Sequence, residues 1–182
     1  MFARCSPETV RLRFFAPIPA FPREYVAALL GGRPDAHDAV VAYRHGPGGR
    51  AYVIGLGSLA AGGGGTGSGA AGVGAEAEAE AGAGAAGSGS GFGGAPAELG
   101  LMVADAWQRQ GVGAAMLDAL LARARARGVT RVSAFVLPGR SALLAALTRR
   151  ERLEPETFAG DGDGLTGVYR LIPPTRPTRP RT

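Results

Sequence analysis

Residues 97–137 read AELGLMVADAWQRQGVGAAMLDALLARARARGVTRVSAFVL, and this stretch decides the fold. Its ends, 97–103 and 131–137, are short apolar runs typical of strands. Between them, residues 112–126 predict an amphipathic helix, because their apolar side chains recur at helical spacing. That face consists of Met116, Leu117, Leu120, Leu121 and Ala124. Gly128 is placed to end the helix.

The sequence on either side continues the same alternation of strands and helices. We expect helices at 23–30 and 141–150, the first of them following Pro22. Strands are predicted at 9–15, at 39–44 and 50–59 as a hairpin around a GPGG turn, and more weakly near 154–158 and at 166–172. Residues 9–15 read TVRLRFF, in which apolar residues alternate with Arg11 and Arg13. The fold class predicted is α/β (α+β), a central mixed β-sheet flanked by helices.

Residues 61–95 interrupt this pattern with a segment in which 26 of 35 positions are Gly or Ala. Such a segment buries too little apolar surface to offset the entropy of ordering its backbone. We expect a disordered Gly/Ala-rich loop that a single domain, 7–172, carries as an insertion. A domain tolerates such an insertion because closing a loop of this length costs only about 1.7 kcal/mol more in conformational entropy than closing a short one. The Pro/Arg tail 173–182 is also predicted to be disordered.

The composition of the 182 residues narrows the function classes. All 20 basic residues are arginine and the net charge is +5, which suits anionic ligands in general. The chain has one cysteine and two histidines, so we expect neither a disulfide framework nor a metal site. No membrane span or secretory signal is predicted, and cytoplasmic localisation is the expectation. No DNA-binding motif or row of interleaved aromatic residues is present, so no nucleic-acid partner is expected.

The loop from Val103 to Gly113 joins a strand to the start of a helix and carries the candidate chemistry. Gly111 permits a sharp turn, Gly113 permits close approach to the backbone, and the free N–H groups of a helix N-terminus attract anions. Arg109 adds positive charge. The spacing fits neither a Walker motif nor the dinucleotide fingerprint. On spacing alone, glycines that merely begin a helix explain the loop about as well as an anion site does.

The motif Gln108-x-x-Gly111-x-Gly113 resembles the acyl-CoA motif of the GCN5-related N-acetyltransferases (GNAT family). The surrounding 97–137, together with SPETVRLRFF, PREYVAALL and HDAVVAYR, is most similar to bacterial protein lysine acetyltransferases. The resemblance implies a GNAT fold, acetyl-CoA as co-substrate and an amine acceptor. It also implies that the pantetheine arm of acetyl-CoA pairs with backbone groups of Leu101, Met102 and Val103, in the strand predicted at 97–103. The pyrophosphate would lie on the backbone N–H groups of Gln108, Arg109, Gln110, Gly111, Val112 and Gly113.

The resemblance also implies a glutamate base, and Glu98 is the candidate catalytic residue. Neutralising a free lysine at pH 7 costs about 4.6 kcal/mol, so a group that accepts its proton assists transfer. Glu98 alternates in phase with Gly100 and Met102. The alternative is a strand-end glutamate that faces solvent.

The chain departs from the family pattern in the helix at 141–150. Many relatives have an asparagine where this chain has Pro138-Gly139-Arg140-Ser141, and a tyrosine that SALLAALTRR lacks. Arg140 could instead reach a CoA phosphate, and Ser141 could cap the helix. Two alternatives to protein lysine acetylation therefore stay open. One is acetylation of a small-molecule amine, and the other is a non-catalytic acyl-CoA-binding regulatory domain.

Three further expectations concern charged and aromatic residues outside the Gln108-x-x-Gly111-x-Gly113 motif. Arg123, Arg125 and Arg127 are expected to form a solvated helix face, with docking of an acidic protein as the alternative. His37 and Asp38 are expected in a turn before a strand rather than as an acid/base pair. Trp107 is expected to pack the loop.

Overall fold

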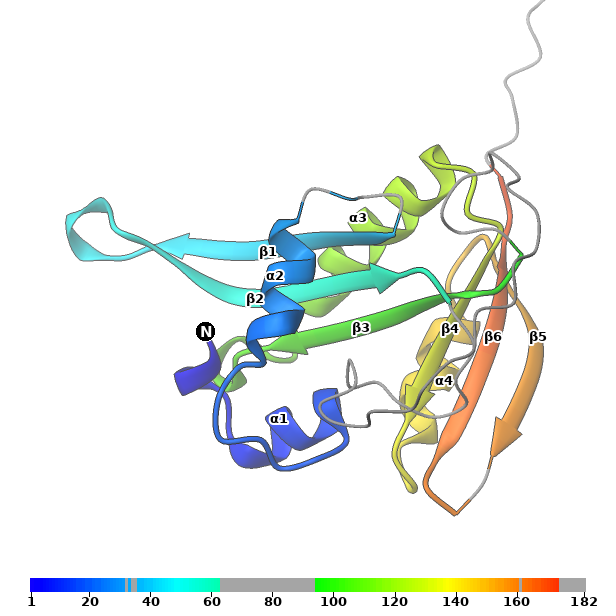
Figure 1. Ribbon diagram of the computed structural model, residues 1–182, viewed down its shortest axis with the longest axis horizontal. Coiled ribbons are helices and arrows are strands. Elements are labelled where there is room, and N and C mark those ends of the chain that lie inside the picture. Colours follow the sequence, from blue (N-terminus) through cyan, green and yellow to red (C-terminus); the bar gives the residue numbers. More distant parts are fainter. Residues whose placement is uncertain (32, 34–35, 63–93, 161, 174–182) are drawn as a thin grey trace, which may run out of the picture.

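The computed structural model describes residues 1–31, 33, 36–62, 94–160 and 162–173 (Figure 1). Its strands form one six-stranded sheet in the order β1-β2-β3-β4-β6-β5. The β3–β4 pair is parallel and the other pairs are antiparallel. The strands are β1 (His37–His45), β2 (Ala51–Ala60), β3 (Ala97–Val103), β4 (Arg131–Val136), β5 (Leu153–Gly160) and β6 (Leu165–Leu171). The predicted mixed sheet is confirmed.

Helices cover both faces of the sheet (Figure 1). In that view α1 (Pro7–Phe14) and α2 (Arg23–Leu30) lie in front, and α3 (Val112–Ala126) and α4 (Ser141–Thr148) lie behind. Short 3-10 turns are present at η1 (Phe2–Arg4), η2 (Pro47–Gly49) and η3 (Asp105–Trp107). The bounds predicted for α2, β3 and α3 are confirmed to the residue.

The strand predicted at 9–15 is wrong, because residues 9–14 belong to α1 and Phe15 is its C-cap. Ser6 caps the helix, its hydroxyl accepting a hydrogen bond from the N–H of Thr9 at 3.2 Å, and Pro7 occupies the first helical position. Val10 and Phe14, four residues apart, are both buried, as a helix face requires. The alternation in TVRLRFF is too short to distinguish the two periods. The Ser-Pro-Glu start was the helix signal.

The α3 face is buried as predicted, and glycines in β2 allow it to approach the sheet closely. Met116, Leu117, Leu120, Leu121 and Ala124 are all buried. A Cβ added at Gly55 would lie 2.6 Å from Sδ of Met116, and one at Gly57 would lie 2.7 Å from Cδ1 of Leu120. Side chains at these two positions of β2 would therefore push α3 off the sheet. Gly128, with φ 76°, follows the last turn of α3 as predicted.

The three arginines near the C-terminal end of α3 are at least partly exposed, as predicted, but each also contacts another part of the protein. Arg123 donates to both carboxylate oxygens of Asp38 at 2.8–3.2 Å, and Arg127 forms a second ion pair with the same carboxylate. Arg125 donates to the backbone carbonyls of Ile172 and Arg152. These contacts within the chain were not predicted from the sequence. Asp38 is buried, and both His37 and Asp38 belong to β1 rather than to a turn before it.

Parts of several predictions concern residues outside the described ranges. The predicted disordered insertion 61–95 lies outside them except for its ends, and so does the tail 174–182. The domain bounds 7–172 stay a prediction. Among the described residues, no helix combines the length and apolarity needed to cross a membrane.

Candidate active site

The site begins where β3 and β4 separate. These parallel strands pair only at Ala97 with Val132 and Glu98 with Ser133. Beyond that point β3 stays paired with β2 as far as Val103, while β4 stays paired with β6 as far as Val136. Figure 1 shows the two strands diverging from this shared start. Sheet pairing therefore leaves one edge of each strand open beyond this point.

A cavity of about 420 Å³ occupies the opening between β3 and β4. Its walls come from β3, β4, the first turns of α3, the C-terminal end of α1, and α4. The residues that line the cavity include Arg13, Glu98, Leu101, Gly113, Phe135 and Arg140. The cavity thus extends from the helix N-terminus that the sequence predicted for a pyrophosphate to the predicted base.

The N-terminus of α3 presents unused backbone donors. Gly111 is the N-cap with φ 84°, and no side chain caps this end. In the part of the chain that the structure describes, the N–H groups of Arg109 through Gly113 donate no hydrogen bond to a backbone carbonyl. Arg109 also has a left-handed backbone, with φ 57°. This geometry, with the positive end of the helix dipole, is suited to binding an anion.

Both the backbone N–H and the side chain of Gln108 make hydrogen bonds within the protein. Its N–H donates to the carbonyl of Asp105 at 3.1 Å, so this group is not one of the free donors. Its side-chain Nε2 donates to the carbonyl of Val103 at 3.0 Å and to Oγ1 of Thr9 at 2.9 Å. The motif glutamine therefore holds the loop against β3 and α1.

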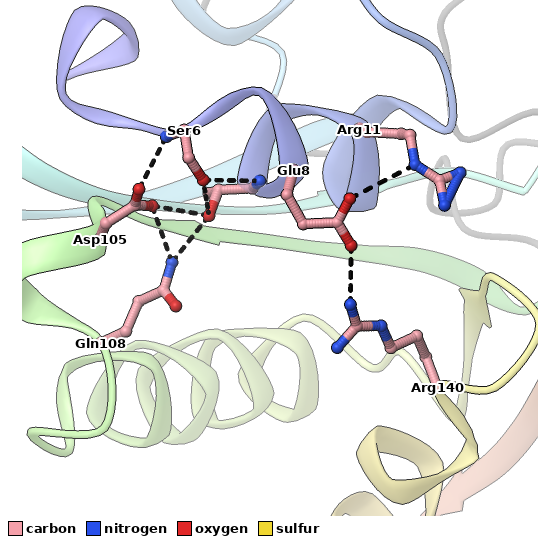
Figure 2. Close-up of polar contacts among 7 residues, drawn as sticks. Ser6, Glu8, Arg11, Asp105, Gln108 and Arg140 are labelled. Carbon is pink, nitrogen blue, oxygen red and sulfur yellow. Dashed lines mark hydrogen bonds and ion pairs between the residues drawn. The ribbon is translucent and has the colours of Figure 1, made fainter.

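Figure 2 shows that Asp105 completes this connection between α1 and the loop. Its carboxylate accepts hydrogen bonds from the N–H of Ser6 at 2.8 Å and from the hydroxyl of Thr9 at 2.7 Å. The hydrogen bonds from Thr9 and Ser6 hold the pKa of Asp105 below its ordinary value. Sequence reasoning missed this contact, since it joins residues 99 positions apart.

A second contact joins α1 to the opposite wall of the cavity. Glu8 accepts a hydrogen bond from Nη2 of Arg140 at 2.7 Å and also pairs with Arg11 (Figure 2). The rings of Phe15 and Phe135 meet edge to face with centroids 4.6 Å apart. Helix α1 therefore contacts both the α3 side and the β4–α4 side of the opening.

Glu98 lies on the cavity wall and is half-buried. Burial raises the pKa of its carboxyl above the ordinary value, and the positive charge of Arg13 acts in the opposite direction. The alternative of a solvent-facing strand-end glutamate does not fit this position. A carboxylate with a raised pKa beside a cavity is suited to accepting a proton near neutral pH.

Of the other predicted site residues, Leu101 and Gly113 line the cavity directly. Met102 is buried on the α1 face of the sheet, where it packs with Val10 and Phe14. Val103 ends β3, and its carbonyl already accepts the Gln108 side chain. The predicted roles of these residues and of the loop Gln108–Gly113 in holding acetyl-CoA stay predictions.

The chain matches the model of the acetyltransferase (GNAT) family over residues 35–149. It belongs to the GNAT family. No curated protein sequence matches it. This acetyltransferase-family assignment includes β1 to α4, and with them the whole opening between β3 and β4.

Solved structures share the GNAT fold at low sequence identity. The GNAT domain of PAT from S. lividans is 23% identical with a TM-score of 0.61, covering 92% of this chain and 80% of that one. A ribosomal-protein-alanine N-acetyltransferase from Brucella melitensis is 21% identical with a TM-score of 0.56, covering 91% and 88%. A domain from Methanocaldococcus jannaschii, at 10% identity and TM-score 0.54, covers 92% and 87%.

The departures from the GNAT pattern are visible at the cavity. Arg140 lies on its wall at the N-cap of α4, and Ser141 is the first helical residue rather than the predicted cap. No tyrosine is among the described residues that line the cavity. No group of three or more His, Cys, Asp or Glu side chains suited to a metal occurs in the described part of the chain. Trp107 lies under the guanidinium of Arg44 on β1, 4.8 Å from the ring centroid.

Proposed function

We propose that this GNAT-family chain is an acetyl-CoA-dependent N-acetyltransferase whose acceptor is an amine, with protein lysine as the leading acceptor class. One observation carries the proposal. A single cavity connects the uncapped N-terminus of α3, at Gly113, with the half-buried carboxyl of Glu98. An acyl-CoA needs an anion site at one end, and acetyl transfer to an amine needs a proton acceptor at the other.

The residues present fit acetyl-CoA. The backbone N–H groups of Arg109 to Gly113 would bind the pyrophosphate, and the open edge of β3 at Leu101 would accept the pantetheine amides. Bound there, acetyl-CoA supplies an activated acetyl thioester. Glu98 then removes the proton from the acceptor ammonium, directly or through a water, which leaves a neutral amine as the nucleophile.

Isothermal titration calorimetry with acetyl-CoA is the first test of this proposal. We expect saturable one-to-one binding, and no heat at millimolar acetyl-CoA would contradict it. Glu98→Gln tests the reaction itself, because it removes the proton acceptor while keeping the side-chain shape. We expect kcat to fall by about 100-fold or more with the acetyl-CoA Kd unchanged.

A non-catalytic acyl-CoA-binding domain is the second candidate, and the absence of tyrosine from the described cavity lining favours it. That function predicts normal acetyl-CoA binding with no acetylated product. Incubating lysate proteins with labelled acetyl-CoA and the purified chain distinguishes the candidates by mass spectrometry. Labelled lysines support the leading proposal, labelled small amines support the small-molecule alternative, and binding without any labelled product supports the regulatory domain.

A further inference from the structure

Arg13 is a buried cation on the wall of the same cavity as Glu98. It lies in the last turn of α1 and is only 8% exposed. Its guanidinium covers Gly100, since a Cβ added there would lie 2.5 Å from Cζ of Arg13. Gly100 follows Glu98 by two residues on β3, so both positions face the same side of the sheet. The guanidinium and the Glu98 carboxyl therefore share one corner of the cavity.

Two neighbouring elements hold this guanidinium in place. Nη2 of Arg13 donates to the hydroxyl of Tyr25 on α2 at 2.8 Å and to Oγ of Ser58 on β2 at 3.2 Å. The Tyr25 hydroxyl itself donates to Oγ of Ser58 at 2.8 Å. The rings of Phe14 and Tyr25 each lie 5.1 Å from the guanidinium carbon. These contacts restrict the guanidinium to one position, which a surface arginine does not maintain.

The other polar and charged groups around Glu98 are either neutral or paired with another carboxylate. Ser133, its neighbour in β4, is uncharged. Arg140 and Arg150, on the α4 side of the cavity, form ion pairs with Glu8 and Asp118. On β1, the pKa of His37 is lowered by burial and by Arg13, so its ring is neutral at pH 7. Tyr25 and Ser58 are neutral hydroxyls bonded to Arg13.

The charge of Arg13 acts directly on the carboxyl. Burial raises the pKa of Glu98, and Arg13 is the charged neighbour that lowers it. Without this cation, a carboxyl in the same half-buried position would retain its proton to higher pH. A protonated Glu98 cannot accept a proton from an ammonium group.

We propose that Arg13 is a positioning residue of the site, whose guanidinium, held by Tyr25 and Ser58, keeps Glu98 ionised as the proton acceptor. This inference rests on the proposed function, in which Glu98 is the base. Arg13 touches no reacting atom in this scheme. Its contribution is the positive charge that it places beside the carboxyl, so a structural role alone would not alter how the rate depends on pH.

The first test compares pH profiles of kcat/KM for Arg13→Gln, Arg13→Lys and the wild-type chain. In Arg13→Gln we expect the acid limb to move to higher pH, so that activity falls by about tenfold at pH 6 and much less at pH 9. Arg13→Lys retains the charge and should retain most of the wild-type profile. Arg11→Gln is the matched control, because it removes the same charge from the same helix at an exposed position. An equal loss at every pH in Arg13→Gln would overturn the proposal.

A second measurement requires neither turnover nor a folded Arg13 variant. The carboxyl of Glu98 is titrated by carbon-13 NMR in the wild-type chain, with its resonance assigned by loss in Glu98→Gln. We expect Glu98 to be ionised at pH 7, and a protonated carboxyl there would overturn the proposal. Because this titration uses no acceptor, absence of any acetylated product would reject the proposed function, while the ionisation of Glu98 would still be measured independently.

Discussion

The packing around Gly113 would also accommodate a larger residue than glycine. A Cβ added there would lie 3.6 Å from Cγ2 of Val103, an ordinary contact. The residue lines the cavity in the first turn of α3, where backbone donors are free. The glycine therefore leaves space for a ligand close to the backbone.

Gly113→Glu should weaken acetyl-CoA binding by at least about 100-fold, because it places a carboxylate where the pyrophosphate would bind. Gly113→Ala is the matched control, and we expect it to bind within a few-fold of wild type. Calorimetric Kd values check both variants, and unchanged melting temperatures establish that they are folded. Tight binding by Gly113→Glu would move the anion site away from α3.

Arg152, in the turn after α4, has a left-handed backbone, with φ 64°. Its carbonyl accepts hydrogen bonds from the N–H of Ile172 and from Arg125, both at 3.0 Å. Both bonds use only the backbone carbonyl of Arg152, so the side chain of Arg152 is not needed for them. The turn after α4 therefore retains a conformational cost that glycine would remove.

We expect Arg152→Gly to raise the free energy of unfolding by about 1 kcal/mol. Arg152→Ala removes the same charge but retains the Cβ, so it should give little of this gain. Urea unfolding of the two variants and the wild type measures the difference. Equal stabilities of the Gly and Ala variants would show that the backbone conformation carries no cost here.

At the scale of elements, the short helix α1 organises the site. Its N-terminal end binds the loop through Thr9, Asp105 and Gln108, and its C-terminal end brings Arg13 and Phe15 to the cavity. Isolated helices of this length are unstable in water, so contacts with other parts of the protein must hold it. The shape of the loop and the position of α1 consequently depend on each other.

Thr9→Val tests this dependence, because it keeps the side-chain shape and removes the hydroxyl that bonds Asp105 and Gln108. We expect a loss of about 1 kcal/mol in stability, faster amide hydrogen exchange in residues 105–113, and several-fold weaker acetyl-CoA binding. Thr130→Val, at an exposed position between α3 and β4, is the control. Unchanged exchange in the loop would mean that the loop keeps its shape without α1.

At the scale of the whole molecule, the buried carboxylate of Asp38 joins the edge strand β1 to α3. Burial alone would raise the pKa of Asp38. The hydrogen bonds and charges of Arg123, with the charge of Arg127, outweigh burial and hold the pKa below its ordinary value. Because the pKa is lower in the folded state, the pair stabilises the fold above the unfolded pKa, about 3.9, and this stabilisation is lost as the pH falls further.

Asp38→Asn should therefore lower the free energy of unfolding by about 1–3 kcal/mol at pH 7, a range that allows for the partly exposed arginines. The difference from wild type should shrink as the pH falls below about 4. Urea unfolding at a series of pH values measures it. Glu156→Gln, which breaks a more exposed group of ion pairs, should have a smaller effect. A difference that does not change with pH would contradict this account.

The sequence by itself determined the unit from β3 to α3, including the buried face of the helix and the open turn at Gly111. These features depend on local spacing and on single glycines, so one segment contains all the information needed. The same holds for Glu98, whose position follows from the strand that carries it. The error at residues 9–15 arose because seven residues fit both periods equally well.

Only the tertiary structure decided which side chains meet across the fold. Asp38 and Arg123 are 85 residues apart, Arg13 and Ser58 are 45 apart, and neither pair has a local signal. Periodicity tells which face of an element is apolar, but the partner of a buried charge depends on strand order and helix placement. The separation of β3 from β4 and the position of α1 across the opening likewise result from packing. Together they form the cavity that connects the predicted anion site to Glu98.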